Sequence, residues 1–334
     1  VLHTAICFGA KANSFAINRS EMRHKMKKKL AIFISVLLLV MQTGCSFGSG
    51  SIRFGTAAVG GVYQAFADSF TSLISKDNDK YRFETKTTAG SAANLRLLSS
   101  GYIDLGIAQA DLMQDAYYGQ GTFKGKSTQG YKAIANLYPE ACQIIVRKDS
   151  GIQSLDDLEG KTVSVGEEES GTERNAEQIL SVAGLTSGLV DKENLNYTEA
   201  ADKLAEGEID AMFCTSGVQT TVIEELARDC DIALIGMDSK LQSRLKTAYP
   251  YYSDYTIAAG TYSGVDTDTA TVCVQAVLVA ADDLSDDTVY DITSFLFDHA
   301  KDIQYTTAID IRMDVQTSWK NIPIPLHDGA ARYY

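Results

Sequence analysis

Residues 52–63 read IRFGTAAVGGVY, and they predict a short apolar strand, a glycine turn and the start of a helix. The helix continues with apolar residues at helical spacing, namely Tyr63, Phe66, Phe70 and Leu73. The first N–H groups of a helix have no acceptor within it, and the helix dipole is positive at that end. A strand that leads through Gly60 and Gly61 into a helix therefore predicts a binding place for an anionic group.

The same unit repeats in the following segment. Residues 81–87 alternate like a strand, a helix is expected to begin at Gly90-Ser91, and residues 103–109 predict a third strand. Strand–helix–strand units with short connections predict a parallel sheet, whose ligands bind beyond the carboxyl ends of the strands. The small, neutral, hydrogen-bonding residues at these ends are Thr56, Gly60, Gly61, Ser91 and Gln109.

A later region has the same organisation. Residues 162–165 predict a strand, and Ser170-Gly171-Thr172 leads into an amphipathic helix that Gly184 ends. This pattern predicts a second anion-binding helix start, facing the first. Residues 167–169 are all glutamate, and their side chains are expected to point to solvent.

Another strand is predicted for residues 208–214, and it ends in Thr215 and Ser216. The segment EGEIDA at 206–211 is similar to SGYIDL at 100–105. Each shows a helix end, a glycine and a strand, so the two regions are expected to share an architecture.

Apolar segments suited to connecting the two regions lie on either side of the second one. Residues 133–138 and 142–146 predict two strands separated by Pro139, and residues 271–281 predict a long strand that crosses between lobes. Tyr138 is expected either to pack at this hinge or to cover the ligand.

Three further expectations concern the remaining segments. Residues 112–134 predict a polar, glycine-rich surface excursion, and residues 286–301 predict one helix. Three arginines are equal candidates for pairing with a ligand carboxylate: Arg96, Arg147 and Arg174.

The composition excludes some functions. The chain has 334 residues, of which 45% are hydrophobic, enough for a substantial core in two lobes. Residues 45–334 carry 23 basic and 42 acidic residues, a net charge of −19. Such a charge repels nucleic acid, and the sequence has no basic patch interleaved with aromatic residues. This balance suits a protein that works outside the cytoplasm.

The N-terminal segment has the features of a secretion signal. A basic stretch at 26–29 precedes an apolar run at 30–41, which is too short for a stable membrane span. Thr43-Gly44-Cys45 resembles a bacterial lipobox, which predicts a lipid on Cys45; cleavage by ordinary signal peptidase is the alternative. Residues 1–25 are expected to be an upstream extension before a start at Met22 or Met26, and residues 47–51 a tether.

The other cysteines have no paired spacing typical of a zinc site. Cys142, Cys214, Cys230 and Cys273 lie in or beside apolar runs and are expected to be free thiols. A disulfide between Cys214 and Cys230 is the alternative. The sequence also lacks G-x-S-x-G, H-E-x-x-H and P-loop motifs, so it predicts a binding protein without a cofactor or metal rather than an enzyme.

Five segments in order resemble the TAXI family of solute-binding proteins, which serve TRAP (tripartite ATP-independent periplasmic) transporters. They are FGTAAVGGVYQAFADSF (54–70), TAGSAANLRLLSSGYIDLGIAQAD (88–111), SLDDLEGKTVSVGEEESGTERNAEQIL (154–180), AAGTYSGVDTDTATVCVQAVLVA (258–280) and PLHDGAARYY (325–334). The resemblance implies a type II periplasmic-binding fold, in which two α/β lobes joined by crossing strands close on a ligand. We expect lobe 1 at residues 51–141 with 275–334, and lobe 2 at residues 142–274.

The resemblance also implies a small carboxylate ligand such as glutamate, glutamine or 2-oxoglutarate, delivered to TRAP membrane subunits. With the secretion signal and the lipobox-like segment, we expect a lipid-anchored, extracytoplasmic protein, and we expect it to be monomeric. An ABC-type binding lipoprotein and a ligand-sensing lipoprotein for a membrane receptor are the alternatives. The residues predicted to bind the ligand are Thr56, Gly60, Gly61, Val62, Tyr63, Ser91, Gln109, Tyr138, Ser170, Gly171, Thr172, Thr215 and Ser216.

Overall fold

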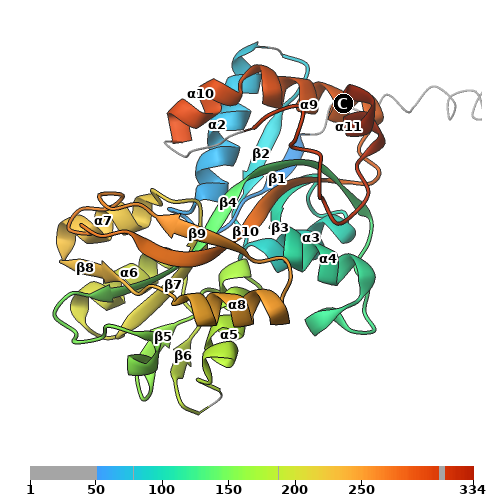
Figure 1. The fold of residues 1–334 in the computed structure, drawn as a ribbon. Helices are drawn as coiled ribbons and strands as arrows, with labels where there is room; N and C mark the ends of the chain where they lie inside the picture. The colour runs from blue at the N-terminus through green and yellow to red at the C-terminus, as the bar shows by residue number, and fades with distance from the viewer. Residues whose placement is uncertain (1–50, 78, 187, 308–312) are drawn as a thin grey trace, which may run out of the picture. The chain divides into compact units, whose positions relative to one another are not determined.

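The computed structural model describes residues 51–334 except 78, 187 and 308–312 (Figure 1). The predicted upstream extension, the secretion signal, the lipid site at Cys45 and the tether up to residue 50 lie outside the described residues. Within the described part of the chain, no helix is both long and apolar enough to cross a membrane.

One mixed sheet runs through both lobes. Its main path is β2 (Phe83–Lys86), β1 (Ile52–Gly55), β3 (Leu105–Gln109), β10 (Thr269–Ala281), β4 (Tyr131–Arg147), β7 (Ala211–Ser216), β5 (Thr162–Ser164) and β6 (Asp191–Glu193). Two further strands extend it, since β8 (Ile232–Leu234) pairs with β4 and β9 (Ser253–Ile257) pairs with β10.

The two longest strands, β4 and β10, pair antiparallel and pass through both lobes (Figure 1). The prediction of two strands separated by Pro139 is wrong, because β4 continues through the proline to Arg147. Pro139 lies beside a register shift opposite Gln275 and Val277, and such an irregularity tolerates a residue that has no N–H to donate. Hydrophobic clusters lie on either side of this pair, two formed by residues of lobe 1 and two by residues of lobe 2.

The two lobes repeat one strand order. In lobe 1 the order is β2-β1-β3-β10-β4, and in lobe 2 it is β6-β5-β7-β4 with β8 on the far side of β4. The similar segments at 100–105 and 206–211 have the same structural role. Asp104 accepts the N–H of Arg53 at 2.7 Å, and Asp210 accepts the N–H of Thr162 at 2.9 Å, so each aspartate ties its segment to the first strand of its lobe.

Helices cover the faces of the sheet. They are α2 (Val62–Asp77), α3 (Ser91–Ser99), α4 (Ala110–Tyr118), α5 (Gly171–Ala183), α6 (Tyr197–Glu206), α7 (Thr221–Asp229), α8 (Ser239–Ala248), α9 (Asp286–Asp298), α10 (Ala300–Thr307) and α11 (Asp328–Tyr333), with 3₁₀ turns η1 (Gly121–Phe123) and η2 (Leu155–Leu158). Helix α4 was not predicted, although its Leu112, Met113 and Ala116 are buried. The helix predicted at 286–301 is in fact two helices that meet at His299.

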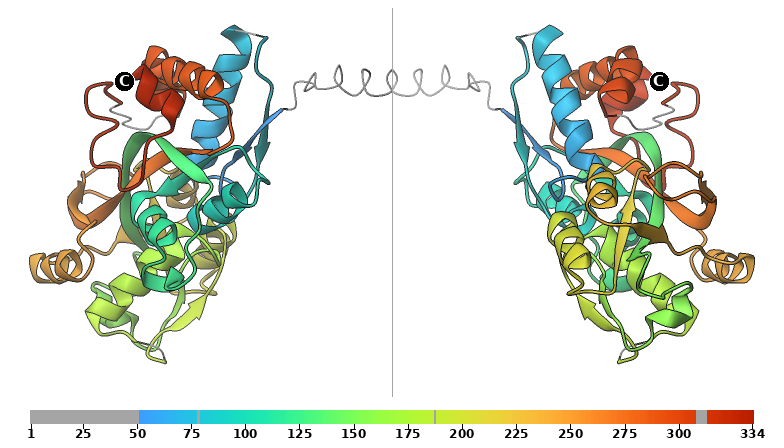
Figure 2. Two further views of the ribbon diagram at one scale, coloured as in Figure 1. Left: turned by 90° about the vertical axis from the view of Figure 1, so that its right-hand side faces the viewer. Right: turned by 90° about the vertical axis from the view of Figure 1, so that its left-hand side faces the viewer.

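The C-terminal helices return to the first helix of the chain, as Figure 2 shows for the red and blue segments. Phe70 of α2 lies 5.5 Å from Phe295 of α9 between ring centroids, and Ser69 is hydrogen-bonded to Thr306 of α10. The alternation of buried Ile52 and Phe54 with Arg53 places β1 on the same apolar cluster. This packing fixes the start of α2, and with it the turn at 56–61.

All four cysteines in the described residues are free. The alternative of a Cys214–Cys230 disulfide is therefore wrong, and the prediction of free thiols is confirmed.

Candidate functional site

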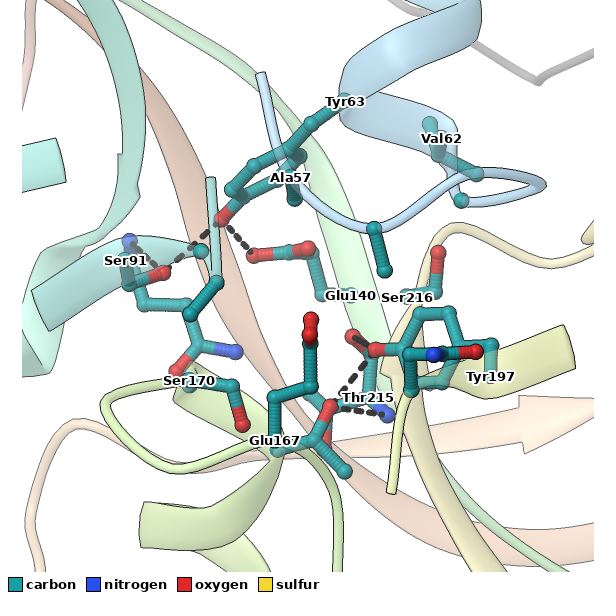
Figure 3. A pocket seen from close by; sticks show the side chains of 18 of the residues that line it. Ala57, Val62, Tyr63, Ser91, Glu140, Glu167, Ser170, Tyr197, Thr215 and Ser216 are labelled. Atoms are coloured by element: carbon teal, nitrogen blue, oxygen red, sulfur yellow. Dashed lines mark hydrogen bonds between the residues drawn. The ribbon is translucent and has the colours of Figure 1, made fainter. Parts of the chain in front are cut away.

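A small cavity lies between the lobes, where the carboxyl ends of β1, β3 and β7 meet the starts of α2, α3 and α5 (Figure 3). It has a volume of about 40 Å³, measured as the space open to the centre of a water-sized sphere. Ten of the predicted ligand-binding residues line it: Gly61, Val62, Tyr63, Ser91, Gln109, Ser170, Gly171, Thr172, Thr215 and Ser216.

Three predicted residues do not line this cavity. Thr56 is buried behind it and donates its hydroxyl to the carbonyl of Lys86 at 3.2 Å. Gly60 has a φ of 80°, which favours glycine, and its role is to form the turn before α2. Tyr138 is buried in the lobe 1 core and borders a separate hollow on the hinge, so its position fits hinge packing.

The helix starts differ in how much of their hydrogen-bonding capacity is free. At α3, the N–H groups of Ala92 and Ala93 donate to the carbonyl of Glu169 in lobe 2, at 3.1 and 3.3 Å. At α5, Ser170 caps the helix by accepting the N–H of Glu173 at 3.0 Å. The first two N–H groups of α5 belong to Gly171 and Thr172, and they meet no acceptor within the described residues. They are the best-placed donors for an anionic group in the cavity.

The hydroxyl of Thr172 is occupied within lobe 2. Tyr197 donates to the carbonyl of Thr215 at 3.1 Å, so the 2.6 Å bond between Thr172 and Tyr197 has the threonine as donor. The same threonine oxygen accepts the N–H of Thr215 at 3.1 Å. Thr172 therefore fixes the wall of the cavity with its side chain and offers a ligand only its N–H group.

A second hydrogen-bonded chain crosses lobe 1 and ends at Glu140, a residue that sequence analysis missed. Tyr63 donates its hydroxyl to Oε2 of Glu140 at 2.9 Å (Figure 3). Since the tyrosine has one proton, the 3.2 Å bond between Tyr63 and Ser91 has the serine as donor, and Ser91 accepts the N–H of Gln109 at 3.1 Å. The chain Ser91 to Tyr63 to Glu140 thus directs two hydroxyl dipoles towards one carboxyl group.

Glu140 has unusual electrostatics for a cavity wall. It is 2% exposed, and burial raises its pKa to about 8, while the hydrogen bonds from Tyr63 and Gln109 oppose that rise. Glu167 lines the cavity from lobe 2, and burial and the charge of Glu199 raise its pKa. The expectation that all side chains at 167–169 point to solvent is wrong for Glu167, because the turn before α5 folds it into the cavity.

No lysine, arginine or histidine is among the described residues that line the cavity. The three arginines considered as partners of a ligand carboxylate pair with acidic side chains of the protein instead. Arg96 pairs with Glu169 at 2.7 Å, Arg174 with Asp115, and Arg147 with Asp149 at 3.0 Å. The first two pairs join the lobes, so these arginines stabilise closure rather than contact a ligand directly.

The lobes also touch directly beside the cavity. Gly171 of lobe 2 packs on the side chain of Gln109 of lobe 1, so closely that a Cβ at Gly171 would lie 2.3–2.5 Å from the amide atoms. Together with the two ion pairs and the bonds from α3 to Glu169, this contact shows that the structure is the closed form.

Comparison with known proteins agrees with this architecture. The NMT1-like family matches residues 54–334. Among solved structures, PhnD1 from Prochlorococcus marinus (MIT 9301) in complex with methylphosphonate is 14% identical, with a TM-score of 0.54 over 81% of this chain and 96% of that chain.

Tv2483 bound to L-arginine is 13% identical, with a TM-score of 0.50 over 78% of this chain and 89% of that chain. The periplasmic aliphatic sulphonate binding protein SsuA from Escherichia coli is 15% identical, with a TM-score of 0.44 over 78% of each chain. The predicted periplasmic-binding fold of two α/β lobes is confirmed.

Proposed function

The chain belongs to the NMT1-like family, and we propose that it is an extracytoplasmic solute-binding protein that encloses a small carboxylate between its lobes. The observation that carries the proposal is the cavity itself. It is enclosed by both lobes, and it is lined by Gly171 and Thr172, whose N–H groups at the start of α5 meet no acceptor within the described residues. Closing the lobes over a ligand adds contacts from both sides, so ligand binding favours the closed form.

The volume of the cavity supports a small ligand. Its backbone donors suit a carboxylate, and glutamate, glutamine and 2-oxoglutarate are the candidates that the resemblance to TAXI proteins suggests. The chemistry of the lining favours binding over catalysis, because the hydroxyl groups of Ser91 and Thr172 are held by protein partners, and within the described residues neither is hydrogen-bonded to a histidine, a lysine or a carboxylate.

The delivery system is part of the proposal. The five TAXI-like segments support a TRAP membrane partner, and the lipobox-like segment at 43–45 supports a lipid anchor on the outer face of the membrane. Genes for TRAP membrane subunits beside the gene for this chain would support that partner. A neighbouring ABC permease and ATPase would contradict it.

A ligand panel tests the binding function. Thermal unfolding is measured with L-glutamate, L-glutamine, 2-oxoglutarate and glutarate, because a ligand that binds only the folded state raises the melting temperature. At least one of them is expected to raise it in a concentration-dependent way. If none does, the proposed ligand class is wrong.

Gly61→Val tests the location of the site. A Cβ at Gly61 would lie 3.2 Å from the carbonyl oxygen of Ala58 and 3.4 Å from the Tyr197 ring, so the larger valine should narrow the cavity. Ligand affinity is expected to fall while the melting temperature without ligand changes little. Unchanged affinity would place the ligand elsewhere.

A further inference from the structure

We propose that the ligand is an amino acid, whose ammonium group binds at Glu140 while its carboxylate binds at the start of α5. The inference rests on the proposed function, because it adds a cation site to the carboxylate site of the same cavity. Among the described residues that line the cavity, Glu140 and Glu167 are those with an ionisable acidic side chain, and they approach it from opposite lobes (Figure 3). A ligand with only negative charge would meet two carboxyl groups and no basic side chain.

The surroundings of Glu140 support a role for its anionic form. The hydroxyl of Tyr63 donates to it at 2.9 Å, and Ser91 donates in turn to Tyr63, so the hydroxyl dipoles of this chain stabilise a negative charge. Yet burial opposes that charge, and the described residues supply no cationic partner to offset it. An ammonium group of the ligand supplies one.

The position of Glu140 also links the cation site to closure. It lies on β4 opposite Val274 of β10, within the strand pair that connects the lobes. The N–H groups of Gly171 and Thr172 lie on the other lobe. A ligand with both an ammonium and a carboxylate group therefore joins one lobe to the other through opposite charges.

The other titratable groups near Glu140 fall into two kinds. Tyrosines and thiols stay neutral in the pH range where Glu140 ionises, and the effect of a nearby carboxyl group can be measured separately by substitution. Tyrosines and thiols that sense the charge of Glu140 have pKa values raised by burial: Tyr63, Tyr138, Tyr197, Cys142, Cys214 and Cys273. Asp111 is the acidic group whose charge raises the pKa of Glu140, and burial raises its own pKa to about 6. Glu167, on the opposite wall of the cavity, also has a pKa raised by burial. Asp111 is absent from the lining of the cavity and serves as the matched control.

Three related compounds separate the two charges of the ligand. L-Glutamine carries both, glutaramate lacks the ammonium group, and 4-aminobutanamide lacks the carboxylate. Calorimetric titration is expected to show that glutaramate binds about 30-fold or more weakly than L-glutamine, because it has no ammonium group to form an ion pair with Glu140. Equal or tighter binding of glutaramate would overturn the inference and leave the proposed function standing. If 4-aminobutanamide binds as tightly as L-glutamine, the cation site stands and the carboxylate site is wrong. If neither L-glutamine nor glutaramate binds, the proposed function and the proposed cation site are both wrong for this ligand class.

The pH dependence gives a test on the unaltered protein. In the empty protein Glu140 has a pKa of about 8, so an ammonium ligand must displace its proton below that pH. The affinity for L-glutamine is expected to fall about 20-fold from pH 7.5 to pH 6, with close to one proton released on binding at pH 7. An affinity that instead falls as the pH rises through 8 would show that protonated Glu140 donates to the ligand, and would overturn the inference.

Substitution of Glu140 provides the last test. Glu140→Gln is expected to weaken L-glutamine binding about 30-fold or more, to leave glutaramate binding unchanged or stronger, and to abolish the proton release. Asp111→Asn is expected to keep the preference for L-glutamine over glutaramate. If Glu140→Gln keeps that preference too, the ammonium does not bind at Glu140.

Discussion

Replacing Gly171 by alanine is expected to hold the lobes apart and so to weaken ligand binding. A Cβ at this position would lie 2.3 Å from Cδ, 2.4 Å from Oε1 and 2.5 Å from Nε2 of Gln109. Gln109 is 1% exposed, so its amide has little room to move away. Gly171 does not have a positive φ, and alanine favours a helix, so the change should not strain α5 itself.

The size of the effect follows from the contact. Forcing one extra carbon into a well-packed site costs about 1–3 kcal/mol. This cost falls on the closed form alone, because Gln109 and Gly171 belong to different lobes. Ligand affinity should therefore drop by about 5- to 150-fold, while the melting temperature without ligand stays close to that of the unaltered protein.

Isothermal titration with the best ligand of the panel measures this loss. Ser181→Ala on the exposed side of α5 is the matched control and should bind as the unaltered protein does. Gln109→Ala removes the obstructing amide, so Gly171→Ala should cost less affinity in that background. The reasoning is refuted if Gly171→Ala binds normally, or if its cost is the same with and without the Gln109 side chain.

Three further outcomes follow from the described contacts. Arg174→Gln breaks a largely buried interlobe ion pair and should lower ligand affinity about tenfold. Arg96→Gln breaks an exposed interlobe ion pair and should lower ligand affinity less than about threefold. Equal losses of affinity, measured by calorimetric titration, would contradict this. Tyr63→Phe removes a hydroxyl that lowers the pKa of Glu140, so the midpoint of the pH dependence of L-glutamine affinity should move above 8. An unchanged or lower midpoint would argue against the hydrogen bond. Among the described cysteines, Cys230 is half-buried and the other three are buried, so a thiol reagent should label Cys230 first in the native protein. Earlier labelling of another of the described cysteines, mapped by mass spectrometry, would contradict the packing.

Local sequence patterns were sufficient for the features that are local in the structure. The glycine turn before Val62 and the Ser170-Gly171-Thr172 helix start are short segments in which each residue type has one main structural use. The repeated Ile-Asp pattern at Asp104 and Asp210 likewise reflects one hydrogen-bonding arrangement used in both lobes. The α/β class followed from these units, because consecutive strand–helix–strand segments allow few arrangements. The two-lobe periplasmic-binding fold was implied by the resemblance to the TAXI family.

Features that depend on distant parts of the chain were missed. Glu140 follows a proline in an apolar segment, and its importance arises because β4 continues through Pro139 and carries the side chain between the lobes. Tyr197 begins α6, and nothing nearby in the sequence indicates that it holds Thr172 and Thr215. An acidic residue between the two predicted apolar strands at 133–138 and 142–146 was the available signal for Glu140.

The hydroxyl groups illustrate a different limit. Ser91 and Thr172 were predicted to bind the ligand because of their residue types, and both do line the cavity. Their hydroxyl protons, however, are donated to Tyr63 and Tyr197. Which group accepts a hydroxyl proton depends on the three-dimensional hydrogen-bond network and cannot be deduced from the spacing of residues in the sequence.

A crystal structure of the protein grown with L-glutamine tests the account most directly. We expect the ligand between the lobes, with its carboxylate within hydrogen-bonding distance of the N–H groups of Gly171 and Thr172 and its ammonium group at Glu140. A ligand bound outside this cavity, or bound there with its carboxylate turned towards Glu140, would contradict the account.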